Sequence, residues 1–295
     1  MAVCVILTGV FALAAVAVPG RLRGRIPGLW AIHVCLWSGL GANLWCLFTG
    51  NHDQTPAGLA VTASSVLVLG GVGGIAAVTP ARPVPVRAAR RVLVVGAHPD
   101  DLELACGATV AKLADSGHEI FALVLTRGGN GGSAEERARE AVAAGRLLGV
   151  SQVRVLDLPD TRLAAHEPEA VAAIEAVVRR FNPDIIFTHS ANDQHADHRA
   201  AHVATLQAAR SHSAILCYES PSVTTDFDPR VFVDVEDYVD LKIAAVGAHA
   251  DQRGKAYMSA ERVRGIALFR GAQAKVRLAE GFEPVRLLRA TPGEL

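Results

Sequence analysis

The stretch RVLVVGAHPDDLE, residues 91–103, runs from a β-branched apolar segment directly into a turn that carries one histidine and three acids. Its apolar part is typical of a buried strand. Similar strand-like runs lie at residues 119–125, 153–158, 184–189, 214–219 and 231–235. Helix-like segments lie at residues 104–116, 134–148, 168–181, 198–210 and 237–251. This alternation predicts an α/β fold, in which a Rossmann-like, mostly parallel sheet is covered by helices on both faces.

The acidic turn falls where the first expected strand ends. In open α/β sheets, ligands bind beyond the carboxyl ends of the strands. A second polar cluster, THSANDQHADHRA at residues 188–200, falls at the end of the fourth expected strand. Because the carboxyl ends of parallel strands meet at one edge of the sheet, we expect the two clusters to lie close together.

The side chains in these clusters match the needs of a catalytic zinc ion, which takes three N or O ligands and keeps one position open for water. His98, Asp101 and His198 can supply the three ligands. Asp100 and His195 would then stay unligated and close enough to transfer protons.

Each cluster alone also has a purely structural interpretation. The HPDD motif at residues 98–101 is compatible with a turn followed by a helix N-cap, since Asp is favoured at both positions. The HADH motif at residues 195–198 is compatible with a solvent-exposed helix start. Their joint occurrence at two strand ends favours the metal site.

Beyond these motifs, the segment of about residues 90–290 resembles the LmbE-like, or PIG-L, family of zinc-dependent de-N-acetylases. AHPDDLELACGAT resembles the first metal motif of the family, and HADHRA resembles the second. The resemblance extends to three further motifs: ERAREAVAAGRLLGV, LPDTRL and KIAAVGAHADQ. It implies an LmbE-like fold and a hydrolase that removes the acetyl group from an N-acetylated amino sugar of the GlcNAc type.

The resemblance also implies a role for each matching residue. The zinc ligands would be His98, Asp101 and His198, with Fe²⁺ as an alternative metal. Asp100 would be the general base, His195 would polarise or protonate the tetrahedral intermediate, and Asp197 would orient the His195 ring. The expected substrate-binding residues are Arg137 and His249.

The first third of the chain has a different character. Three stretches, residues 2–18, 29–48 and 57–78, are apolar and contain no Lys, Arg, Asp or Glu. Each approaches the ~20 residues that a helix needs to cross a bilayer. They predict three transmembrane helices within residues 1–80, followed by a linker at 81–91 and a deacetylase domain at 92–295.

Arginine bias predicts the orientation of this anchor. The connector PGRLRGRIP, residues 19–27, carries three arginines, whereas TGNHDQTP, residues 49–56, carries no Lys or Arg. By the positive-inside rule, the catalytic domain lies on the cytoplasmic side of the cell membrane. This location suggests a lipid-linked N-acetylated sugar as the substrate.

The charge balance and the cysteine spacing argue against two further kinds of binding. Lys plus Arg and Asp plus Glu balance at 29 each, so no strong positive field predicts a nucleic-acid partner. The five cysteines show no paired metal spacing. Nothing in the sequence predicts an oligomeric state.

Three other functions compete with the deacetylase. Gly129, Gly131 and Ala134 fit a GxGxxA spacing, and Asp157 ends the following strand, so a nucleotide site is one alternative. A non-catalytic, membrane-tethered sugar-binding protein is a second. An amidase acting on a thiol conjugate is a third, because the same metal site would support it.

Overall fold

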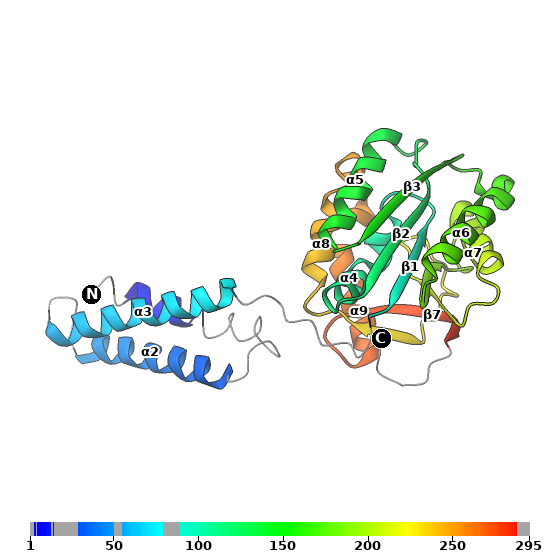
Figure 1. The fold of residues 1–295 in the computed structure, drawn as a ribbon. Coiled ribbons are helices and arrows are strands. Elements are labelled where there is room, and N and C mark those ends of the chain that lie inside the picture. Colours follow the sequence, from blue (N-terminus) through cyan, green and yellow to red (C-terminus); the bar gives the residue numbers. More distant parts are fainter. Residues whose placement is uncertain are drawn as a thin grey trace. The chain divides into compact units, whose positions relative to one another are not determined.

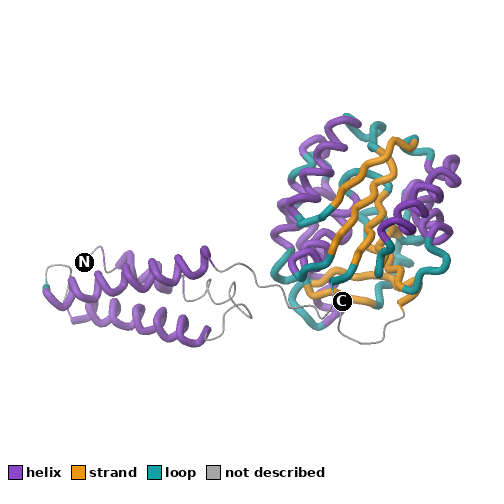
Figure 2. Tube along the Cα trace, in the orientation of Figure 1, coloured by secondary structure: helices purple, strands orange, loops and turns teal. Residues whose placement is uncertain are grey.

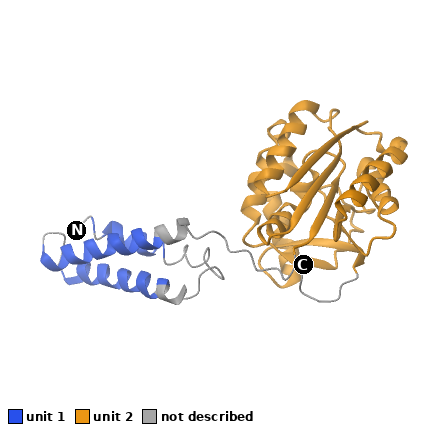
Figure 3. Cartoon of the chain, in the orientation of Figure 1, with its two compact units in different colours: residues 1–82 blue, residues 83–295 orange. Residues whose placement is uncertain are grey.

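The structure is a computed structural model that describes residues 3, 5–12, 14, 29–49, 55–78 and 89–287 (Figure 1, Figure 2). The chain divides into two compact units, residues 1–82 and residues 83–295 (Figure 3). The arginine-bearing connector and residues 81–88 of the expected linker lie outside the described residues, and the first expected span is described only in part.

The described part of the first unit is helical. Helix α2 (Leu29–Thr49) and helix α3 (Pro56–Val78) are joined by a buried hydrogen bond of 2.7 Å from the Asn43 side-chain amide to the Ser65 hydroxyl. Within the described ranges, no helix is both long enough and apolar enough to cross a membrane. The three predicted transmembrane helices are therefore not found among these residues, although their sequence stretches are apolar.

The second unit is built on one seven-stranded sheet with the order β3-β2-β1-β4-β5-β7-β6. The strands are β1 (Arg91–Gly96), β2 (Glu119–Thr126), β3 (Gln152–Leu158), β4 (Ile185–His189), β5 (Ala214–Tyr218), β6 (Val231–Asp234) and β7 (Ala279–Leu287). Neighbours among β1 to β5 are parallel, whereas β7 runs antiparallel to both β5 and β6. The predicted α/β fold with a mostly parallel sheet is confirmed.

Helices cover both faces of this sheet, as predicted, with α6 and α7 on one side and α4, α5 and α8 on the other (Figure 1). The helices are α4 (Asp101–Asp115), α5 (Ala134–Leu147), α6 (Glu167–Phe181), α7 (Ala196–Ala208), α8 (Val239–Gly247) and α9 (Ala260–Ala274), with the short 3₁₀ helices η1 (Leu163–His166), η2 (Ala250–Gln252) and η3 (Ala256–Met258). The two faces have separate cores, because alternate residues of β1 point in opposite directions. Val92 and Val94 belong to one core, and Leu93 and Val95 to the other.

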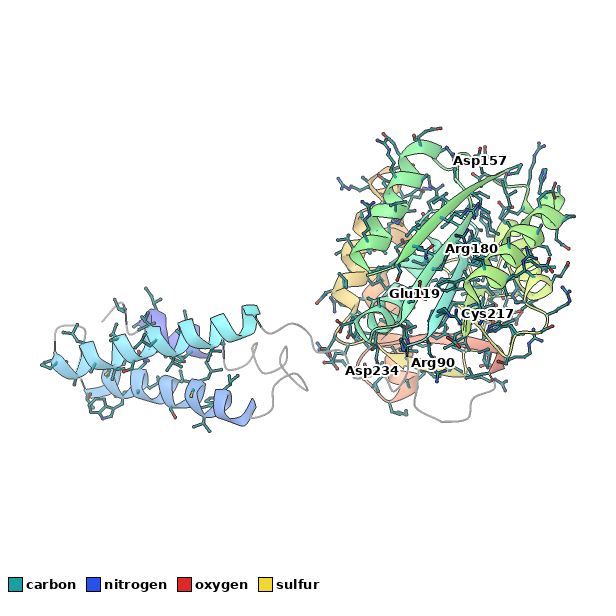
Figure 4. All side chains as sticks on the ribbon, in the orientation of Figure 1. Arg90, Glu119, Asp157, Arg180, Cys217 and Asp234 are labelled. Carbon is teal, nitrogen blue, oxygen red and sulfur yellow. The ribbon has the colours of Figure 1, made fainter. Side chains whose placement is uncertain are left out.

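Strand order decides where ligand-binding side chains gather. Arg90, which precedes β1, and Asp157, near the end of β3, mark the amino and carboxyl ends of the parallel strands (Figure 4). The loops that follow β1, β2, β3 and β4 all leave the sheet at the carboxyl ends of the strands. This is the edge at which open α/β sheets bind their ligands.

Candidate metal centre

The turn after β1 places the first group of side chains. The backbone N–H of His98 donates to the Asp101 carboxylate at 2.7 Å, so Asp101 closes the turn and also begins helix α4. Asp100 has φ 112°, in the left-handed region. For a non-glycine residue such backbone costs about 1–3 kcal/mol and is found most often at functional sites.

The ring of His98 lies between carboxylates. Its Nε2 is 3.1 Å from Asp160 and 3.3 Å from Asp197, and its Nδ1 is 3.6 Å from the Asp101 carboxylate. Ionised carboxylates only accept hydrogen bonds, so the proton of a neutral His98 ring belongs on Nε2. The lone pair on Nδ1 then faces the side on which Asp101 lies.

His198, in the first turn of α7, has the same arrangement. Its Nδ1 is 2.9 Å from Asp193, and its Nε2 is 3.3 Å from the Asp101 carboxylate. Ser220 and Ser222 also donate to Asp193 and hold its carboxylate in place. A carboxylate that fixes one histidine nitrogen while the other stays free is the usual environment of a metal-binding histidine.

Two of the predicted ligands, His98 and His198, thus converge on the third, Asp101, and all three side chains are buried. Burial lowers the pKa of His198, but Asp101 and Asp193 outweigh this effect and raise that pKa to about 9. The acids thus create a strongly negative environment, in which a divalent cation would displace protons from the imidazoles. The donor set and its outer partners fit a metal ion of the zinc type.

The cluster contains a further histidine that was not predicted, His189 at the end of β4. Its ring stacks on His198 at 3.9 Å between centroids, and its Nε2 is 3.0 Å from Asp101. Burial and the neighbouring His198 lower the pKa of His189 to about 4, so the ring is neutral. Asp101, His189 and His198 bring ligand atoms within 4.8 Å of one another, as do His98, His195 and His198.

Asp100 lies beside the candidate ligands without joining them. It is 5% exposed, and its carboxylate is 3.3 Å from the Arg137 guanidinium. Burial and the neighbouring Asp101 carboxylate raise the pKa of Asp100 to about 7, although Arg137 opposes this shift. A carboxylate with a pKa near neutrality is suited to accept a proton from water.

His195 and Asp197 are both in the site, but not as the predicted pair. The Nδ1 of His195 accepts from the backbone N–H of Asp197, which makes His195 the N-cap of α7. The Asp197 carboxylate instead faces His98 and accepts from the backbone N–H groups of Thr161 and Leu163. Asp197 thus orients a candidate ligand and the loop after β3, not the His195 ring.

Arg137 lines the site, as expected of a substrate-binding residue. Its guanidinium also donates to the carbonyls of Gly128 and Pro99, at 2.6 and 2.9 Å, and to Asp100. It therefore holds two loops and the candidate base before any substrate arrives. Its Nε is buried without a partner.

Two glycines of the loop after β2, Gly128 and Gly131, lie against this arginine. Gly128 has φ 65°, and a Cβ there would lie 2.4 Å from the Arg137 guanidinium; at Gly131 the distance would be 2.7 Å. Asp157 is exposed and lies 3.2 Å from Arg127. Gly128 and Gly131 thus lie against the Arg137 side chain, and Asp157 pairs with Arg127 at the surface, so two residues of the nucleotide pattern, Gly131 and Asp157, have other partners.

His249, the other predicted substrate-binding residue, is 1% exposed. Its Nε2 lies 3.4 Å from the Glu103 carboxylate. Burial lowers the pKa of His249, but Glu103 outweighs this effect and raises it. His249 thus lies next to the first turn of α4 and is not among the residues that line the pocket at the cluster.

An open pocket of about 490 Å³ gives access to the cluster. Its inner wall consists of His98, Asp100, Asp101, Arg137, Asp160, His195 and His198. Its outer wall includes Asn130, Thr161, Ser222, Lys255, Tyr257 and Arg262. The volume lies within the range of small-molecule sites, about 300–1,000 Å³.

An α/β sheet with a pocketed His/Asp cluster at its carboxyl edge, and an unligated carboxylate beside it, defines a candidate metal-dependent hydrolase. A family model described as PIG-L, GlcNAc-PI de-N-acetylase, matches residues 93–209. The uncharacterized deacetylase YaiS of Escherichia coli is 38% identical over 165 residues, which cover 54% of this chain and 89% of YaiS. The chain belongs to the PIG-L family of de-N-acetylases.

Other relatives agree with this assignment. The diacetylchitobiose deacetylase of Thermococcus kodakarensis is 28% identical over 237 residues, covering 71% of this chain and 86% of that protein. Among solved structures, the N,N'-diacetylchitobiose deacetylase of Pyrococcus horikoshii has a TM-score of 0.60 and 26% identity, covering 70% of this chain and 88% of that one. The conserved protein TT1542 of Thermus thermophilus has a TM-score of 0.62 and 29% identity, covering 69% and 98% of the two chains.

Proposed function

We propose that this protein is a metal-dependent deacetylase that releases acetate from an N-acetylated amino sugar of the GlcNAc type. One observation carries the proposal. Two histidines, His98 and His198, each have one ring nitrogen on a carboxylate and the other directed toward Asp101, while the candidate base Asp100 lies next to them. Support also comes from the relatives, two of which are named as deacetylases of diacetylchitobiose.

Zinc is the proposed metal, with Fe²⁺ as the alternative for a mixed N and O ligand set. His98, Asp101 and His198 would hold it. When bound, such an ion lowers the pKa of a coordinated water toward ~7 and polarises a carbonyl group.

The residues around the metal would carry the proton transfers. Asp100 accepts a proton from the attacking water, whose oxygen bonds to the acetyl carbon. His195 donates a hydrogen bond to the developing oxyanion. The C–N bond then breaks as the protonated Asp100 passes its proton to the amine nitrogen, which gives the free amine and acetate. General acid–base assistance of this kind contributes about 10²–10⁴-fold to a rate.

The charged residues on the outer wall of the pocket favour a particular kind of substrate. Lys255 and Arg262 are its charged residues among the described lining residues. They would attract a negatively charged group attached to the sugar, such as the phosphate of a lipid-linked conjugate. This charge supports the proposal that the substrate is lipid-linked.

The apolar surface of the first unit supports membrane attachment through residues 1–80. Large apolar side chains of α2 and α3 are exposed, among them Trp37 at 57%, Phe48 at 88% and Leu67 at 77%. Exposed apolar surface of this kind marks a membrane or protein contact. The proposed location is the cytoplasmic face of the cell membrane.

Acetate release tests the proposed activity. The purified full-length chain, stripped with a chelator and reloaded with Zn²⁺ or Fe²⁺, is assayed with N,N'-diacetylchitobiose and with GlcNAc linked through a phosphodiester to a lipid. We expect metal-dependent acetate release, faster from the charged conjugate. A metal-loaded protein that releases no acetate from either would exclude the sugar deacetylase and favour an amidase for other N-acyl substrates, including thiol conjugates.

A further inference from the structure

Helix α4, which begins with the candidate ligand Asp101, is broken in its middle. Cys106 has φ −133° and ψ 19°, outside the helical region. In a regular α-helix, the N–H of Thr109 would donate to the carbonyl of Ala105, and the N–H of Ala108 to that of Leu104. A break at Cys106 removes these partners from buried backbone groups, which must then be satisfied in another way.

Two side chains from distant elements fill the break. Glu280, on β7, accepts from the N–H groups of Ala108 and Thr109 at 3.2 and 2.7 Å. Lys242, on α8, donates to the carbonyl of Ala105 at 3.3 Å and to Glu280 at 2.6 Å. The pair therefore replaces the lost helical bonds on both sides of Cys106.

Both residues are buried, an environment in which charged side chains are rarely found. Lys242 is 4% exposed and Glu280 is 5% exposed. A buried ion pair stabilises only when further hydrogen bonds satisfy both partners, and here the backbone of α4 supplies them. Gly107 leaves the room that this requires, because a Cβ there would lie 3.3 Å from Cγ of Lys242.

The two halves of α4 have separate attachments. The second half is tied to the β6 region: Lys112 donates to the carbonyl of Asp234 at 2.7 Å, and Tyr238 donates to Asp115 at 2.6 Å. The first half carries Asp101 into the site. The geometry at the break thus sets the angle between the half that carries Asp101 and the half that is tied to the β6 region.

We propose that Lys242 and Glu280 are positioning residues of the metal centre. They hold the break in α4 open at one angle and thereby direct Asp101 toward the two histidines. Neither residue is among those that line the catalytic pocket; both line a smaller neighbouring cavity of about 80 Å³. Their proposed action is therefore on the helix. The inference rests on the proposed function, because it requires that the centre binds a metal.

The test compares Glu280→Gln and Glu280→Leu with wild type in the full-length chain, measuring Zn²⁺ affinity by chelator competition, and kcat and KM for acetate release. Gln keeps one oxygen that accepts from the backbone, and Leu keeps none. We expect Zn²⁺ affinity to fall about tenfold for Gln and further for Leu, with kcat reduced and KM unchanged. The matched control is Glu236→Gln, which breaks an exposed ion pair with Arg277 and should leave both properties unchanged.

A folded Glu280→Gln protein with wild-type Zn²⁺ affinity and wild-type kcat would overturn the inference, even if its melting temperature were lower. If both Glu280 variants fail to fold, Gly107→Ala decides. Its Cβ would lie 3.3 Å from Cγ of Lys242 and would push that side chain slightly without removing a charge, and Ala favours the helix more than Gly does. We expect reduced Zn²⁺ affinity without loss of folding; unchanged affinity would contradict the proposal. A wild-type protein that binds no metal would instead refute the proposed function itself.

Discussion

At the residue scale, two acids orient the histidines of the candidate metal centre. The sequence predicted the candidate ligands and the candidate base, which lie in two short motifs at strand ends, but not these acids. Asp160, in the loop after β3, lies 3.1 Å from His98, and Asp193, before α7, lies 2.9 Å from His198. The contact between Asp160 and His98 joins two different loops, and such a contact leaves no periodic signal in a sequence. Asp193 stands only five residues before His198, but nothing in the local pattern shows that the two side chains pair. The Pro-Asp turn of LPDTRL was visible, but its partner was not.

The cysteine at position 217 offers a separate test at this scale. Burial, and to a smaller extent Glu283, raises the pKa of Cys217 to about 12. Because the thiolate is the reactive form, we expect iodoacetamide at about pH 8 to leave Cys217 unmodified in the native protein. Mass spectrometry of the Cys217 peptide measures this, and the same peptide alkylated in denaturant is the control. Rapid native alkylation would show that the β5 region is not packed as described.

At the element scale, β1 to β6 and helices α4 to α8 were predicted near their observed positions, but α9 and β7 were not. Helix α9 exposes Ile266, Leu268 and Phe269, so it lacks a clean apolar stripe. Strand β7 contains Pro284, which lies opposite Leu216 next to a shift in register, and a proline within an apolar run argues against a strand. Contacts with the rest of the fold, and not the local hydrophobic pattern, stabilise both α9 and β7.

The loop between β2 and α5 allows a paired glycine test. Gly128→Ala would place a side chain at φ 65° and against the Arg137 guanidinium. We expect a loss of stability of about 1–2 kcal/mol from the backbone alone and a fall in kcat of up to about 10²-fold from misplacement of Asp100.

Gly129→Ala in the same loop is the control, because its Cβ would meet only the Cβ of Ala134 at 3.4 Å. Calorimetry and acetate release measure both variants. Equal losses of stability and kcat in the two variants would contradict a specific contact between Gly128 and Arg137. They would instead support a role for the GxGxxA pattern.

His118, which directly precedes β2, should make the free energy of unfolding depend on pH. The buried His118 accepts a hydrogen bond of 3.0 Å from the backbone N–H of Arg90. Burial and the charge of Arg90 lower its folded pKa below the ordinary value of 6.5. The unfolded chain therefore binds the proton more readily, so this contribution to stability is complete above pH 6.5 and is lost as the pH falls below it.

Thermal unfolding of wild type and His118→Gln between about pH 8 and pH 5 measures this effect. The variant has no titrating group at this position. We expect the melting temperature of wild type minus that of the variant to decrease as the pH falls. A constant difference would show that His118 does not change its protonation preference on folding.

At the scale of the whole molecule, the sequence predicted a division into an apolar N-terminal part and a catalytic part, and the structure forms two compact units. The membrane-spanning character of the first part does not follow from the described residues. We expect the full-length chain to float with liposomes in a density gradient, and residues 83–295 to stay at the bottom. Recovery of the full chain away from the liposomes would remove the support for membrane attachment and for a lipid-linked substrate.

The central claim is that Asp100 acts as the base beside a metal held by His98, Asp101 and His198. The most direct test measures bound metal and acetate release together for wild type and Asp100→Asn, which preserves the shape of the side chain. We predict equal metal content in the two proteins and acetate release reduced about 10²–10⁴-fold in the variant. Near-wild-type acetate release from metal-loaded Asp100→Asn would contradict the account.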